Sequence, residues 1–183
     1  MKKIFYITTA LFLGSFITQS CTSSQVAVPV TQSYEELNTS LQNKEFAFVA
    51  TKAYPTDLSS LNAMNRLKPA GAVFRLLDLD YGYGFKLRGR ELKADLPFFG
   101  RMYQTSMSPD LNGIKFDSKQ AWVEITTTKK KTVISIKPTD ISRIDKMYLE
   151  VYPNGRAYLS IDSNDRQPIS FDGYITKIPE SRK

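Results

Sequence analysis

Hydrophobic and polar residues alternate along most of the chain with a period of two, which is the pattern of β-strands that have one buried face. Phe46, Phe48 and Ala50 alternate with polar or small neighbours and predict a strand over Glu45–Lys52. A last strand of the same kind is expected over Ile169–Ile175. The repeated pattern predicts a mostly β protein.

One short N-terminal helix precedes these strands. Ser33 and Glu36 have the spacing of a capping box, and the chain from Tyr34 to about Asn43 contains neither glycine nor proline. Residues 54–71 form an irregular stretch bounded by prolines, within which a short helix near Leu58–Leu67 is also compatible with the pattern.

Three hairpins follow from the rule that directly opposed residues share a face of the sheet. In the first, the loop Gly89-Arg90 has glycine in its first position, as a type II′ turn requires. The register set by this loop joins apolar partners: Leu87 with Leu92, Phe85 with Ala94, and Tyr83 with Leu96.

The third hairpin, between Met147–Tyr152 and Arg156–Asp162, needs a choice of loop. A loop of Asn154-Gly155 alone would place Leu149 opposite Ser160, whereas the longer loop 153–155 places it opposite Leu159. We therefore expect a type I turn followed by a left-handed glycine. The second hairpin joins Ala121–Thr127 to Thr132–Lys137. The pairs expected in these two hairpins are Ile125 with Ile134, Val123 with Ile136, Val151 with Ala157, Leu149 with Leu159, and Met147 with Ile161.

With a further strand around Ile114 and Phe116, the pattern gives about eight or nine short strands. Regularly spaced strands separated by turn signals favour an antiparallel meander of hairpins, folded as a β-sandwich or a partly closed barrel. We expect a single β-rich domain over residues 33–177 and a C-terminal tail over 178–183.

The N-terminus is typical of a secreted protein. Lys2 and Lys3 precede an uncharged run over residues 4–17, which is shorter than the about 20 residues of a membrane-spanning helix. The single cysteine, Cys21, follows this run in a sequence that resembles a bacterial lipobox. We expect residues 1–20 to be a lipoprotein signal peptide, Cys21 to carry the lipid, and residues 21–32 to form a polar tether.

An exported protein with one cysteine cannot close an internal disulfide, which favours lipidation. No acidic cluster follows Cys21, and this favours an anchor in the outer membrane that faces the periplasm. Loss of the signal peptide lowers the formal charge from +7 to +5. Export and this mild charge argue against nucleic acid as a binding partner. They leave the membrane, an envelope protein or a glycan as partners, with anionic polymers and lipid headgroups suited to the basic charge.

The sequence contains no histidine. This absence removes the commonest general base, the histidine-activated serine and cysteine nucleophiles, and the commonest ligand of transition metals. The sequence therefore gives no catalytic residue, no metal site and no cofactor. A hydrolase that uses paired carboxylates is conceivable, but no spacing singles out a pair.

Other polar and aromatic groups have plain structural interpretations. Asp78 and Asp80, and the cluster Asp162, Asn164 and Asp165, lack the calcium-loop pattern that ends in a bidentate glutamate, so we interpret them as solvated loop acids. Three consecutive lysines, 129–131, are interpreted as a charged hairpin tip, and contact with an anionic surface is the alternative. The tyrosines and Trp122 could line a ligand pocket, but on alternating strands we expect them to pack in the core or across strands.

Four segments in a fixed order resemble the family called domain of unknown function 4251, whose members are predicted lipoproteins of gram-negative bacteria. They are Leu96–Arg101, Gly113–Phe116, Asn154–Ile161 and Asn164–Gly173, behind an opening Phe46-Ala47-Phe48. The resemblance covers about residues 33–176 and implies a β-rich domain that is periplasmic or anchored to the outer membrane. It implies no activity, because none is assigned to the family.

The candidate binding residues within these segments are Arg101, Asn164 and Arg166. Arg166 lies in a polar loop, and a guanidinium binds carboxylate or phosphate through a rigid fork. The anchor, the β scaffold and the missing histidine together favour a non-catalytic binding or assembly module of the cell envelope. The alternative is a β-barrel that carries a small apolar ligand in its interior.

Overall fold

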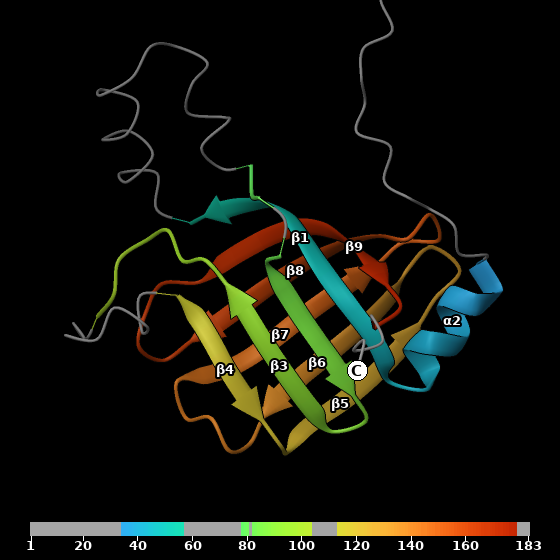
Figure 1. Cartoon of the computed structure of the whole chain (residues 1–183), viewed down its shortest axis with the longest axis horizontal. Coiled ribbons are helices and arrows are strands. Elements are labelled where there is room, and N and C mark those ends of the chain that lie inside the picture. Colours follow the sequence, from blue (N-terminus) through green and yellow to red (C-terminus); the bar gives the residue numbers. More distant parts are fainter. Residues whose placement is uncertain (1–33, 57–77, 81, 104–112, 179–183) are drawn as a thin grey trace, which may run out of the picture.

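The computed structural model describes residues 34–56, 78–80, 82–103 and 113–178. Within them, one short helix is followed by nine antiparallel strands that form a nearly closed barrel (Figure 1). The expected mostly β meander is confirmed, and the barrel is the form it takes. Cys21, the expected signal peptide and tether, Ser33 and the expected helix near Leu58–Leu67 lie outside the described residues.

The strands follow the order β4-β3-β2-β1-β9-β8-β7-β6-β5 in a single sheet. The first strand therefore pairs with the last, and β4 and β5 are the two edges that almost meet. The elements are α2 (Tyr34–Gln42), β1 (Glu45–Pro55), β2 (Gly84–Arg88), β3 (Glu91–Leu96), β4 (Ile114–Ser118), β5 (Ala121–Thr127), β6 (Thr132–Pro138), β7 (Ile144–Val151), β8 (Arg156–Ser163) and β9 (Ile169–Thr176).

All three hairpins have the expected register. Leu87 opposes Leu92, Ile125 opposes Ile134 and Leu149 opposes Leu159, together with the neighbouring pairs. Both turn glycines adopt positive φ angles, 59° at Gly89 and 78° at Gly155, as the two predicted turns require. The apolar pattern and the turn chemistry thus agree on one pairing.

The expected pair of Tyr83 with Leu96 is wrong. The β2–β3 ladder ends where Gly84 opposes Asp95, and Tyr83 is left 37% exposed. Gly82 and Gly84, on either side of Tyr83, have φ angles of 113° and 157°, conformations that favour glycine. The chain turns here, and the Tyr83 carbonyl accepts a hydrogen bond from the Ala50 N–H of β1.

Side chains at alternate positions fill the interior of the barrel. Phe46, Phe48, Phe85 and Phe171 are buried there with leucine and isoleucine side chains from the facing strands. The rings of Phe48 and Phe85 stack with centroids 5.6 Å apart, and Phe46 meets Phe85 edge-on at 6.0 Å. Burial of each such side chain stabilises the fold by about 1.5–3 kcal/mol, so this packed interior is the main source of stability.

Strand β1 continues to Pro55, beyond the predicted end at Lys52. A bulge between Ala50 and Lys52 shifts its register against β9, so that the inward positions resume at Ala53. The alternation that predicted the strand is broken at this point, which explains the early predicted end. The bulge also leaves Thr51 and Lys52 together on the outer side, where both line a hollow.

The short helix α2 lies at the end of the barrel where β1 begins, as Figure 1 shows. Leu37 and Leu41 on its inner side join the core. The Gln42 side-chain amide donates a hydrogen bond to Thr127 Oγ1 at 3.3 Å, which ties the helix to the edge strand β5. Among the described residues, no helix has the length and apolar character needed to cross a bilayer.

Candidate functional site

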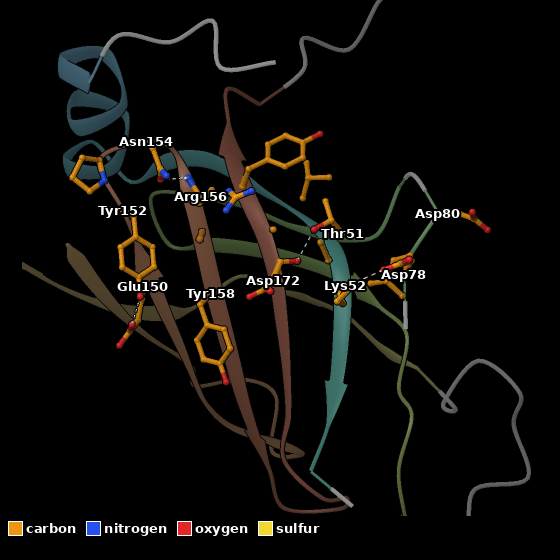
Figure 2. Close-up of a pocket in the computed structure, with 17 residues that line it drawn as sticks. Thr51, Lys52, Asp78, Asp80, Glu150, Tyr152, Asn154, Arg156, Tyr158 and Asp172 are labelled. Atoms are coloured by element: carbon orange, nitrogen blue, oxygen red, sulfur yellow. Dashed lines mark hydrogen bonds and ion pairs between the residues drawn. The ribbon is translucent and has the colours of Figure 1, made fainter. Parts of the chain in front are cut away.

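A broad open hollow lies on the outer face of the barrel, where β1, β9 and β8 run side by side (Figure 2). Its volume is about 1470 Å³. Outward-facing side chains of these strands line it, joined by Glu150 from β7, the β7–β8 turn, and Asp78 and Asp80 from a separate segment beside β1.

Five opposed side chains form a row across this hollow, which we call the hollow row: Glu150, Tyr158, Asp172, Lys52 and Asp78. Glu150 opposes Tyr158, Tyr158 opposes Asp172, Asp172 opposes Lys52, and Lys52 bridges to Asp78. Directly opposed residues share a face of the sheet. Figure 2 shows these side chains following one another across the strands. The register alone therefore places a tyrosine between two carboxylates.

Glu150 is held at one side of the row by two donors. The Lys131 ammonium lies 2.6 Å from Glu150 Oε1, and the Tyr152 hydroxyl donates to Oε2 at 3.3 Å. The hydrogen bond from Lys131 to Glu150 raises the pKa of that lysine, which favours the charged pair. These two donors fix the carboxylate in place within the lining of the hollow, and an ionised carboxylate has further acceptor sites.

Asp172 is held on the other side of Tyr158. The hydroxyl of Tyr54 donates to Asp172 Oδ2 at 2.7 Å. Burial, the hydrogen bond to Asp172 and its negative charge raise the pKa of Tyr54 from 10.0 to about 12. Tyr54 therefore remains a donor at any physiological pH and orients the Asp172 carboxylate.

Acidic groups prevail in the hollow although the whole chain is basic. Among the described lining residues, Asp78, Asp80, Glu150 and Asp172 are acidic, and Lys52 and Arg156 are basic. Lys131 beside Glu150 does not reverse this balance. Lys52 pairs with Asp78 at 3.2 Å, but both side chains are solvent-exposed, so the pair contributes at most about 1 kcal/mol.

Among the described residues, Trp122 and tyrosines such as Tyr148 and Tyr158 lie on the outer surface, so the expected packing in the core is wrong for them, and packing across strands stays a prediction. Trp122 is 51% exposed, and Tyr148 and Tyr158 are each 37% exposed. The hairpin register contained the signal that would have placed them. Because Leu149 and Leu159 face inward, their neighbours Tyr148 and Tyr158 must face outward.

Arg166 is buried, with 1% of its surface exposed. Its guanidinium donates from Nε to Asp165 Oδ1 at 3.0 Å, from Nη2 to Asp165 Oδ2 at 2.9 Å, and from Nη1 to the Gly113 carbonyl at 2.9 Å. It also lies 5.0 Å from the centre of the Phe98 ring. These contacts hold the β8–β9 loop against the segment before β4, which is a structural role.

Asp165 is not the solvated loop acid expected from the sequence, because both of its oxygens are bound by Arg166. Asn164 is exposed, and its side-chain amide donates to the Ser142 carbonyl at 2.8 Å. Arg101 has an exposed side chain, and its backbone N–H donates to Gln167 Oε1 at 3.1 Å. Arg101, Asn164 and Arg166 thus lie around one loop, and none of them lines the hollow.

Among the described residues, no group of three or more histidine, cysteine, aspartate or glutamate side chains is placed to hold a metal ion. The hollow row brings together an aromatic face, carboxylate acceptors beside it, and hydroxyl and ammonium donors that fix those acceptors.

The family described as a domain of unknown function, DUF4251, matches residues 30–175. Comparisons with curated proteins and with solved structures give no significant match. The matched residues include α2, all nine strands up to Ile175, and the whole hollow row. The chain therefore belongs to the DUF4251 family.

Proposed function

We propose that this protein is a non-catalytic binding module of the cell envelope, attached to the outer membrane through a lipid on Cys21 and facing the periplasm. The observation that carries the binding role is the hollow row, in which Tyr158 lies between Glu150 and Asp172 on an open face. The sequence of the N-terminus supports the anchor.

The packing of the interior favours an external site over a carrier of small apolar ligands. A carrier barrel needs an internal cavity. In the described residues, the space between the strands holds Phe46, Phe48, Phe85 and Phe171, whose side chains are buried in one contiguous cluster. Ligand recognition therefore falls to the outer face.

The state of the carboxylates favours binding over hydrolysis. A glycoside hydrolase needs one carboxyl group that gives a proton to the leaving group. Glu150 accepts hydrogen bonds from Lys131 and Tyr152, and Asp172 accepts one from Tyr54. Both groups are arranged as acceptors, and the chain has no histidine to act in their place.

Capture from detergent-solubilised envelopes of a gram-negative host tests this proposal. The tagged full chain is compared with Asp172→Arg, which places a guanidinium in the hollow. The control is Asp145→Arg, the same charge change at an exposed β7 residue that does not line the hollow. We expect a component that is retained by the wild type and by Asp145→Arg and is lost with Asp172→Arg.

Thermal unfolding of each variant verifies that the barrel is intact. Equal capture by all three chains, or capture of nothing by any of them, contradicts the binding role of the hollow.

A further inference from the structure

We propose that the hollow binds a neutral glycan, with one sugar ring stacked on Tyr158 and its hydroxyl groups donating hydrogen bonds to Glu150 and Asp172. This inference rests on the proposed function and adds the chemical class of the ligand. It is carried by the cross-strand placement of one exposed aromatic ring between two fixed acceptors.

The aromatic ring supplies the apolar half of the site. Tyr158 lies between Glu150 and Asp172 in the row and is 37% exposed. Its neighbours along β8, Ala157 and Leu159, are buried in the core. The C–H face of a sugar ring is flat and weakly apolar, and burying it against a tyrosine removes apolar surface from water at both partners.

The carboxylates supply the polar half. Neighbouring strands are about 4.8 Å apart, so the backbones at Glu150 and Asp172 are separated by about 10 Å, with Tyr158 between them. Ionised carboxylates only accept hydrogen bonds, and sugar hydroxyls can donate them. A ring lying on Tyr158 thus presents hydroxyl groups toward an acceptor on each side, and hydrogen bonds to charged groups are the stronger kind.

Three other ligand classes fit this arrangement less well. An apolar ligand would bury both carboxylates and offer no donor to their remaining acceptor sites, which costs free energy. An anionic polymer would meet the acidic majority of the lining, although the chain as a whole is basic. A cationic ligand would be attracted by this acidic majority, but it would compete with Lys52, which pairs with Asp78, and with Lys131, which pairs with Glu150.

The extent of the hollow favours an oligosaccharide over a single sugar. Its volume of about 1470 Å³ exceeds the roughly 300–1,000 Å³ of pockets for small molecules. Thr51, Asn154 and Tyr174 continue the lining away from Tyr158 with side chains that both donate and accept hydrogen bonds. Further sugar units would meet these groups.

A printed array of neutral, anionic and cationic glycans tests the assignment. The full chain is applied in a zwitterionic detergent, because detergents with sugar headgroups would compete for the site. Hits are then measured by titration calorimetry with the free oligosaccharide. We expect binding to neutral glycans, weakened at least tenfold by Tyr158→Ala, which corresponds to about 1.4 kcal/mol.

Two further variants separate stacking from loss of the fold. Tyr158→Phe retains the ring, so we expect its affinity to stay within about threefold of the wild-type affinity, which corresponds to about 0.7 kcal/mol or less. Tyr148→Ala is the matched control, because Tyr148 has the same 37% exposure on the neighbouring strand but does not line the hollow. Its affinity should equal that of the wild type.

Absence of neutral glycans among the hits, binding by anionic or cationic glycans alone, or undiminished binding by Tyr158→Ala overturns this inference. The capture experiment distinguishes its failure from that of the proposed function. If the component lost with Asp172→Arg is degraded by protease and resists periodate, the hollow binds a protein. The proposed function then holds and the glycan assignment is wrong.

Discussion

Arg166 and Asp165 are neighbours in sequence, and the guanidinium of the first binds both carboxylate oxygens of the second at 3.0 and 2.9 Å. The same guanidinium donates to the Gly113 carbonyl, more than fifty residues earlier in the chain. The arginine thus joins the β8–β9 loop to the segment that leads into β4. Arg166 is buried and forms an ion pair with Asp165 in addition to the hydrogen bond to Gly113. Removing one partner of such a pair leaves the other charge uncompensated, which strongly destabilises the fold.

Replacement of Arg166 by methionine should lower the free energy of unfolding by about 3 kcal/mol, because the Asp165 carboxylate and the Gly113 carbonyl lose their donors. Arg101→Met is the control, since Arg101 is exposed and its change should stay within about 0.5 kcal/mol. Urea unfolding of the two variants measures both values. Equal stability of the two would show that the Arg166 contacts contribute little.

The same pair makes stability sensitive to acid. The hydrogen bonds from Arg166 hold the pKa of Asp165 below its usual 3.8. A lowered pKa in the folded state gives stability that is complete above 3.8 and is lost as the pH falls through the lowered value. We therefore expect the stability difference between wild type and Asp165→Asn to be constant near neutral pH and to shrink below pH 3.8. A difference that stays constant down to the acid transition would contradict this origin.

The strands of the barrel follow from local signals, and the sequence was sufficient to predict them. The pairing of Leu149 with Leu159 required only the alternation of apolar residues and the chemistry of the turn at Gly155. The pairing of β1 with β9 and the bulge after Ala50 depend on contacts between residues more than a hundred positions apart. The sequence of a single strand carries no information on such long-range contacts, so the predicted end of β1 fell short of the observed end.

The candidate site was recognised only in part for a different reason. Residue types suggested Arg166 as a ligand, because an arginine in a polar loop is usually exposed, but tertiary contacts bury it. The tyrosines as a group were expected in the core or packed across strands on residue type, although the register of the β7–β8 hairpin places Tyr158 outside. At this position the two-residue period of the strand and the usual burial of an aromatic residue predict opposite faces of the sheet, and the observed face is the one that the period predicts.

The close approach of β1 to β9 gives a prediction about Gly173. A Cβ atom at Gly173 would overlap the Val49 carbonyl oxygen and lie 2.7 Å from the Phe48 ring. Gly173→Ala must therefore displace backbone or core side chains, and we expect a loss of about 3 kcal/mol in unfolding free energy. Gly155→Asn is the control, because its positive φ of 78° suits asparagine and its Cβ would meet no atom within 4 Å. Similar melting temperatures for the two variants would refute the close contact.

Tyr54 predicts a loss of stability in alkali. Its pKa is raised from 10.0 to about 12 by burial and by the hydrogen bond to Asp172, so the folded state retains a proton that the unfolded chain releases. The contribution is present below pH 10 and is lost as the pH rises toward 12. Tyr54→Phe removes this pH dependence, and its phenolate absorbance titration should lack the tyrosine that titrates at about pH 12. If the variant shows the same alkaline decline as the wild type, another group is responsible.

The anchor at Cys21 leads to the last prediction. If signal cleavage exposes Cys21 as the modified N-terminal residue, cells grown with a palmitate analogue should label the wild-type chain and leave Cys21→Ala unlabelled. The same substitution should move the protein from the membrane fraction to the soluble fraction of the periplasm, because the remaining domain contains no apolar helix long enough to span a bilayer among its described residues. Ser20→Ala is the control, since it changes a neighbouring position and retains the thiol. Labelling of Cys21→Ala at the wild-type level would place the lipid on another residue. Absence of label from all three chains would contradict the lipid anchor, and the binding role of the hollow would then be tested on the soluble chain.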